Sequence, residues 1–183
     1  MPGDLDATAE LAPETVECKS YDGRYQLDPT RFVLEPSVRA LRLPIVRGRF
    51  TARSGHLVLG DEGELALELD SGSLWTNVFG LAGTLTKEGA LCAADYPAIR
   101  FRSTDQLVLP DGSIEVAGRI EVLDVVRDVR LKGKLSRVDE AAVVLWLTGV
   151  LPPPRRQFAG GRWIARVLGR RPIHLELAAE FVR

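Results

Sequence analysis

Ile114-Glu115-Val116-Ala117-Gly118-Arg119-Ile120-Glu121-Val122 places an apolar residue or a glycine at every even position. The same period of two recurs in residues 129–135 and 173–181. Successive side chains of a β-strand point to opposite faces, so this alternation predicts strands with one face buried and the other in water. The sequence therefore predicts an all-β protein.

Turn signals separate these stretches from other candidate strands. They are Asp61-Glu62-Gly63, Asp70-Ser71-Gly72, Pro110-Asp111-Gly112 and Asp139-Glu140. Many short antiparallel strands must hide their edges, and closure into a barrel does so. We expect an antiparallel up-and-down barrel of about eight strands, near residues 22–28, 31–40, 45–58, 64–70, 98–109, 113–123, 128–148 (long enough for two) and 172–182.

One or two short helices are expected to cap this barrel. Residues 73–94 lack the period of two, and Trp75, Phe79 and Leu85 are spaced more like helical turns. Residues 162–169 hold a second helical pattern of about two turns. Because these segments are short, helix should make up well under a third of the chain.

The composition fits a single globular domain. The chain has 183 residues, 45% of them hydrophobic and 27% charged, and its net charge of -1 gives no general attraction to nucleic acid. Residues 1–20 carry five acidic residues against one lysine. We therefore expect an acidic flexible arm there and one barrel domain over 21–183. Residues 1–6 lack the pattern of a secretory signal, which predicts a cytoplasmic protein.

An ordered set of segments spans about two thirds of the chain. It consists of Tyr25-Gln26-Leu27-Asp28-Pro29-Thr30, Val46-Arg47-Gly48-Arg49-Phe50, Gly55, Asp70, Ser73, Thr76, the block 95–103 and Gly118-Arg119-Ile120. This set resembles the YceI-like family. The resemblance implies a lipocalin-like barrel that binds an isoprenoid or another long-chain lipid, and it implies a homodimer. The chain departs from the family pattern at Ala40, Asp124 and Asp128, where relatives more often have histidine, glycine and proline.

The inward face of the barrel is the candidate binding site. An eight-stranded barrel is just wide enough either to be filled by side chains or to hold one small ligand. The expected lining is apolar: Leu34, Phe50, Leu67, Leu69, Ile99, Phe101, Val116, Ile120, Leu175 and Leu177. Gly118, Gly133 and Ala179 also fall on inward positions, where small residues would leave room for a ligand, so Gly133→Leu should reduce uptake in a folded barrel. Core packing explains each lining residue singly, so a filled barrel remains an alternative.

A ligand held mainly by apolar contact must be long. Each buried methylene contributes about 0.8 kcal/mol, whereas association costs about 4 to 15 kcal/mol. Burial of about ten or more carbons is therefore needed, which favours an isoprenoid, quinone-like or fatty chain over a small metabolite. We expect no cofactor apart from such a bound lipid.

Residues 155–171 form a basic segment with amphipathic spacing. Arg162, Arg166 and Arg170 fall on one face of a short helix and Trp163 on another, and Arg171 follows. The helix could close its own barrel as a lid with Trp163 inward, or dock through its arginines on an anionic membrane surface. The acidic arm could also cover the arginines. In a filled barrel, the same segment would instead make the protein an interaction or adaptor module. No other feature favours a nucleic-acid partner.

The residue types and motifs that catalysis most often uses are scarce in this chain, which predicts a binding protein rather than an enzyme. The chain has two histidines and two cysteines, and it has no nucleophile-elbow, dinucleotide or phosphate-loop motif. Neither histidine has a second metal ligand at the usual spacing. We therefore expect no catalytic residues and no metal site.

Overall fold

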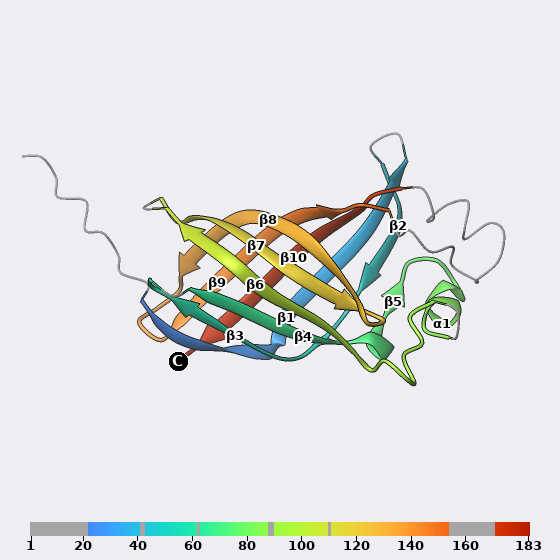
Figure 1. The fold of residues 1–183 in the computed structure, drawn as a ribbon, viewed down its shortest axis with the longest axis horizontal. Helices are drawn as coiled ribbons and strands as arrows, with labels where there is room; N and C mark the ends of the chain where they lie inside the picture. Colours follow the sequence, from blue (N-terminus) through green and yellow to red (C-terminus); the bar gives the residue numbers. More distant parts are fainter. Residues whose placement is uncertain (1–21, 41–42, 62, 88–89, 110, 154–170) are drawn as a thin grey trace, which may run out of the picture.

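Within the described residues, the chain forms a closed antiparallel barrel of eight strands (Figure 1). The computed structural model describes residues 22–40, 43–61, 63–87, 90–109, 111–153 and 171–183. The barrel strands are β1 (Gly23–Ala40), β3 (Ala52–Leu59), β4 (Glu64–Asp70), β6 (Ala98–Val108), β7 (Ser113–Val122), β8 (Val125–Arg137), β9 (Ala142–Leu151) and β10 (Ile173–Val182). Each pairs with the next along the chain, and β1 pairs with β10 to close the barrel. The predicted all-β, up-and-down fold is confirmed.

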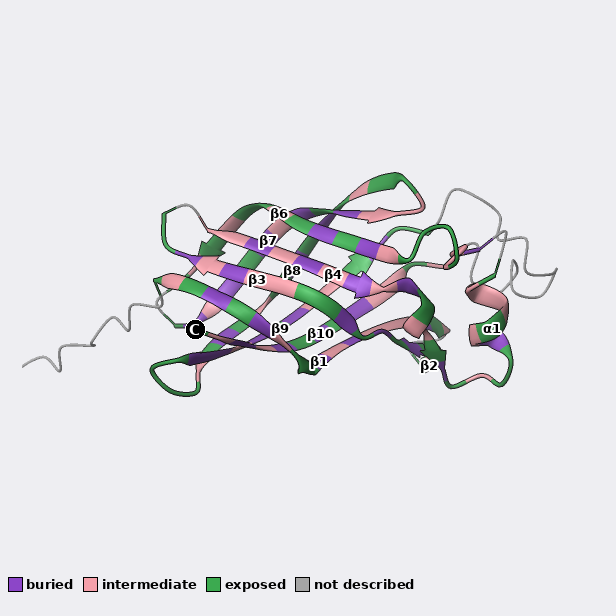
Figure 2. Cartoon of the chain, turned by 90° about the horizontal axis from the view of Figure 1, so that it is seen from below, coloured by how far each residue is buried: buried purple, intermediate pink, exposed green. Residues whose placement is uncertain are grey.

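Alternation of burial along each strand explains why these residues form a barrel. On β7, Ile114, Val116 and Ile120 are buried, while Glu115 and Arg119 are exposed. Figure 2 shows the same alternation of buried and exposed bands on the strands. The buried face of every barrel strand contributes to one apolar cluster, which forms the core.

The barrel has two unlike ends. At one end, which we call the turn end, short turns join β3 to β4, β6 to β7 and β8 to β9. The C-terminus also lies there, because the Arg183 guanidinium donates to the carbonyl of Asp22 and lies 4.9 Å from the Tyr25 ring centroid. The other end, the α1 end, carries the β1–β2 hairpin, the β7–β8 turn and the segment 71–97 (Figure 1).

Two strand boundaries differ from the sequence prediction. Residues 22–28 and 31–40 form the single strand β1, because the Asp28 carboxylate accepts from the Thr30 amide at 2.9 Å and makes a bulge while pairing with β10 continues on both sides. The predicted strand 45–58 is instead two strands, β2 (Leu43–Arg49) and β3. They separate at Thr51, whose amide donates to the Ser73 hydroxyl and whose carbonyl accepts from the Asp70 amide.

The segment expected to cap one mouth does lie at the α1 end, but its predicted helical spacing is wrong. It contains the 3-10 turn η1 (Ser71–Ser73), the short strand β5 (Trp75–Thr76) and the helix α1 (Leu81–Leu85). Trp75 pairs with Arg49 of β2 and so belongs to a strand. The helix starts only after Gly80, whose φ of +73° turns the chain.

Helix α1 packs on a sheet extension beyond the barrel. Leu81 contacts a small cluster with Val38 and Val46, and Val78 and Ile173 pack against it. Strands β1, β2 and β5 form this extension, and β5 is its edge strand. No helix among the described residues is long and apolar enough to cross a bilayer.

Candidate ligand-binding site

The barrel interior brings together all ten apolar residues predicted to line it. Each of them is buried and belongs to the single core cluster. Among the described residues, the only buried polar side chains are Ser71 and Thr76, both in the segment at the α1 end, and no charged side chain is buried. The interior is therefore lined by apolar side chains, with Tyr25 and its hydroxyl as an exception near the turn end. Contact of these ten residues with a ligand stays a prediction.

The interior is covered more tightly at one end than at the other. The largest fully buried side chains, such as Tyr25, Leu65 and Phe181, lie on the turn-end halves of their strands. The cluster members that keep the most exposure, 8–9%, all lie toward the α1 end: Leu34, Phe50, Ala52, Ile120, Leu151 and Leu175. The α1 end is thus the less tightly covered end of the barrel, and we call it the mouth. Sequence reasoning missed Ala52 and Leu151 as lining residues, although Leu151 continues the alternation of β9.

The inward glycines do not leave the room that the sequence suggested. Gly118 is buried, but a β-carbon there would lie 2.6 Å from the Phe101 ring, so that ring already occupies the space. At Gly133 a β-carbon would meet the backbone of Trp146 and Leu147 on β9. Both glycines serve close packing, so the prediction that they create a cavity is wrong.

A match to a family model decides the family. The model of the YceI-like domain matches residues 25–178, which covers most of the chain. The chain belongs to the YceI-like family. A comparison with curated protein sequences gives no match.

Solved YceI-like structures share this fold at low sequence identity. Burkholderia cenocepacia BcnA is 15% identical, with a TM-score of 0.64 over 84% of this chain and 98% of that chain. The Campylobacter jejuni YCEI protein is 17% identical, with a TM-score of 0.65 over 80% and 90%. A polyisoprenoid binding domain from Saccharophagus degradans, implicated in plant cell wall breakdown, is 14% identical, with a TM-score of 0.60 over 86% and 97%. At these identities the likeness shows the fold alone.

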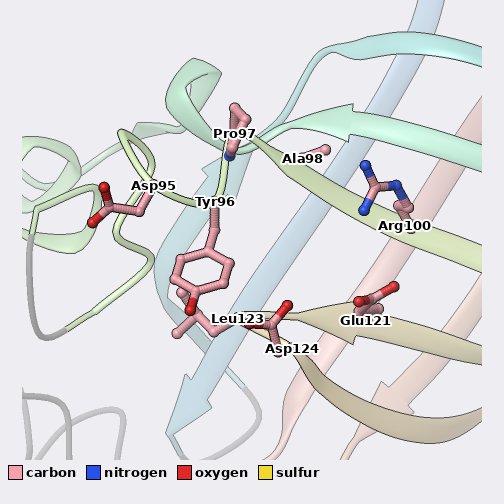
Figure 3. Close-up of a pocket in the computed structure, with 8 residues that line it drawn as sticks. All are labelled: Asp95, Tyr96, Pro97, Ala98, Arg100, Glu121, Leu123 and Asp124. Carbon is pink, nitrogen blue, oxygen red and sulfur yellow. The ribbon is translucent and has the colours of Figure 1, made fainter.

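The β7–β8 turn is an unusual feature of this YceI-like chain. Leu123 and Asp124 both have positive φ, +55° and +57°, a conformation that favours glycine or asparagine. Asp124 is the position where the sequence departs from the glycine of relatives. The turn borders a pocket of about 260 Å³ on the outer wall, between the turn and the loop 95–97 (Figure 3). Arg100 and Glu121, which are paired across β6 and β7, also line it.

Tyr96 reaches across this pocket to the turn. Its hydrogen bond with the Asp124 carboxylate raises the pKa of Tyr96 above the usual value for tyrosine. Tyr96, on the loop before β6, and Asp124, in the β7–β8 turn, thus both line this pocket (Figure 3).

We expect Tyr96 to ionise at higher pH in the folded protein than in the unfolded chain. The folded state then holds the hydroxyl proton more tightly, so this bond stabilises the fold below the ordinary tyrosine pKa of about 10 and is lost as the pH rises through the folded pKa. An ultraviolet titration of tyrosine, with Tyr96→Phe subtracted, measures the shift. Asp124→Asn should return the Tyr96 pKa toward its usual value, and an unchanged titration would contradict the bond.

His56 lies on the outer wall, away from the interior. Its Nε2 is 3.1 Å from the Glu64 carboxylate, which also faces Arg102 at 3.3 Å. The His56 hydrogen bond, with the nearby Arg102 charge, lowers the pKa of Glu64. Among the described residues, no three histidine, cysteine, aspartate or glutamate side chains gather as metal ligands.

Most of the predicted basic contact surface lies outside the described residues. Arg162, Trp163, Arg166 and Arg170 fall in the segment 154–170, so the lid and membrane hypotheses for them stay predictions. Arg171 is described, and its guanidinium donates to the carbonyl of Arg39 at 3.0 Å, at the end of β1. The acidic arm of residues 1–20 also lies outside the described residues.

Proposed function

We propose that this YceI-like protein binds and carries a long-chain apolar ligand, such as an isoprenoid, a quinone-like lipid or a fatty chain, inside the half of the barrel next to the α1 end. The observation that carries the proposal is the graded burial of the interior. Core side chains at the turn end, such as Leu65, are fully covered, whereas Leu34, Phe50, Ile120 and Leu175 at the α1 end keep 8–9% exposure. A chain entering there would meet only apolar side chains.

The chemistry of the interior favours binding over catalysis. Without a buried charge among the described residues, nothing in the lining would polarise a bond or recognise a polar head group. Affinity would come from burial of methylenes, at about 0.8 kcal/mol each. The ligand must then displace or reorder side chains of the continuous core, so Leu175 and Ile120, near the mouth, are the expected first contacts. The printed description of the Saccharophagus degradans domain, a polyisoprenoid binding domain, supports the same ligand class.

Native mass spectrometry of the protein purified from cells tests this function. We expect a population heavier than the chain by the mass of one apolar lipid, which organic extraction removes and lipid analysis identifies. A protein that stays at the mass of its bare chain after gentle purification, and takes up no added isoprenoid or fatty acid, would contradict the proposal. That result would favour the filled-barrel adaptor.

A further inference from the structure

One face of the sheet extension exposes apolar and basic side chains together. On β2, Leu43, Ile45 and Arg47 point away from the buried Val46, which packs against Leu81 of α1. Along residues 75–79 the same alternation leaves Trp75 and Phe79 exposed, while Thr76 is buried. We call the surface made by Leu43, Ile45, Arg47, Trp75 and Phe79 the β2–β5 face.

The register of β2 and β5 makes this face continuous. Trp75 is paired with Arg49, and the Asn77 amide donates to the Arg47 carbonyl at 3.1 Å. The chain then bends at residues 77–80 toward α1, so Phe79 lies in the turn that follows β5 rather than in the ladder. Helix α1 covers the other side of the same strands, so among the described elements the β2–β5 face has nothing packed on it.

The exposure of this face is too large to be incidental. Leu43 is 69% exposed, Trp75 is 59% exposed and the Phe79 side chain is fully exposed. Single exposed apolar residues are ordinary on protein surfaces, but a contiguous group that includes two aromatic side chains marks a binding surface. The face also lies at the α1 end, the same end as the mouth of the barrel.

The exposed charges carried by β2 itself are basic. Residues 43–49 contain Arg47 and Arg49 and no acidic residue. Arg49 pairs with Glu35 of β1 at 2.6 Å, while the side chain of Arg47 is exposed. Next to β2, Arg39 is also exposed, and its carbonyl accepts from Arg171, where the basic segment 155–171 rejoins the barrel.

From this combination we propose that the β2–β5 face docks on a bilayer that contains anionic lipid. Phe79, Trp75 and Leu43 would enter the interfacial region, and Arg47 would contact the head groups. A second copy fits the face less well, because a twofold interface would bring the positive charges of both copies of Arg47 into one interface. The inference rests on the proposed function, since docking here would present the mouth of the barrel to the membrane from which an apolar ligand is collected.

Vesicle sedimentation tests the docking directly. The full-length protein is mixed with vesicles of phosphatidylcholine, with and without phosphatidylglycerol. We expect binding to the anionic vesicles, and a loss of about tenfold or more in the double variant Leu43→Ser, Phe79→Ser. The matched control is Leu107→Ser, Val138→Ser, which removes two side chains at the turn end that are each more than half exposed, and it should leave binding unchanged. Arg47→Gln should weaken binding most at low salt.

Trp75 reports whether the face itself enters the lipid. With Trp146→Phe and Trp163→Phe as background, brominated acyl chains should quench the remaining fluorescence. The docking proposal is overturned if the Leu43→Ser, Phe79→Ser variant binds anionic vesicles as well as the wild type does. The arginines of residues 155–171 would then account for the binding without the β2–β5 face. It is equally overturned if Phe79→Ser abolishes a dimer seen by light scattering, because a second copy would then cover the face.

The vesicle assay contains no added ligand, so its result separates the two proposals. Binding to vesicles by a protein that carries no lipid in native mass spectrometry would remove the carrier function and leave the docking. If the purified protein carries lipid but does not bind vesicles, the docking proposal is contradicted and the carrier function stands.

Discussion

Replacing Gly133 with alanine should lower the free energy of unfolding by about 3 kcal/mol, an unusually large effect for a single methyl group. The added β-carbon would overlap the carbonyl oxygen of Trp146, and it would lie 2.8 Å from the carbonyl carbon and 2.9 Å from the Leu147 α-carbon. These are backbone atoms of the paired strand β9, so they cannot swing aside as a side chain could. Urea denaturation measures the loss.

Gly83→Ala is the matched control for this prediction. A β-carbon at Gly83 meets nothing within 4 Å, and the residue lies inside helix α1. Alanine favours helix over glycine by about 1 kcal/mol, so this variant should unfold at the same or a slightly higher urea concentration. If the Gly133→Ala protein is as stable as the wild type, β8 and β9 can move apart locally to make room for the added methyl group, and the prediction is contradicted.

This result would also show what the sequence could not reveal about the glycines. Alternation predicts that Gly118 and Gly133 lie on the inward face. The structure confirms this, because Gly118 lies between the buried Val116 and Ile120. Likewise, Gly133 lies between the buried Leu131 and Leu135. The absence of a β-carbon does not say what fills the space. That depends on how closely β9 approaches Gly133 and where the Phe101 ring turns, and both depend on tertiary packing.

The strands themselves were largely predictable because their signal is local. The sequence predicts strands near 64–70 and 113–123, and the structure has β4 at Glu64–Asp70 and β7 at Ser113–Val122, since a period of two fixes which face is buried. Trp75 and Phe79 were misassigned because two strand residues are too few to show a period. The pairing partner of Trp75, Arg49, lies 26 residues away, so the β2–β5 face could be recognised only in the folded chain.

Leu65→Ala and Leu175→Trp should separate the stability of the barrel from its capacity for a ligand. Both leucines belong to the core, but Leu65 is 0% exposed at the tightly covered turn end and Leu175 is 9% exposed toward the mouth. Truncating Leu65 leaves a closed void, which should cost about 4 kcal/mol of unfolding free energy. Because a ligand entering from the α1 end need not reach Leu65, the retained lipid per folded chain should stay at the wild-type level.

Leu175→Trp should have the opposite pattern. The larger ring would occupy the volume behind the mouth that a lipid chain needs, so retained lipid should fall by about tenfold or more, the equivalent of losing two buried methylenes or more. Overpacking should cost about 1–3 kcal/mol, less than the Leu65 truncation, because side chains near the less tightly covered end can shift to make room for the ring. Native mass spectrometry and urea denaturation of the same samples give both quantities.

The volume-conserving variant Leu175→Met controls for the loss of leucine at this position, and it should keep both stability and lipid. If Leu175→Trp retains as much lipid as the wild type while Leu65→Ala loses it, the ligand occupies the turn end and solvent exposure is no guide to where it enters. If neither variant changes lipid retention, the bound chain lies outside the barrel. In that case the graded burial of the interior would describe only how the core is packed.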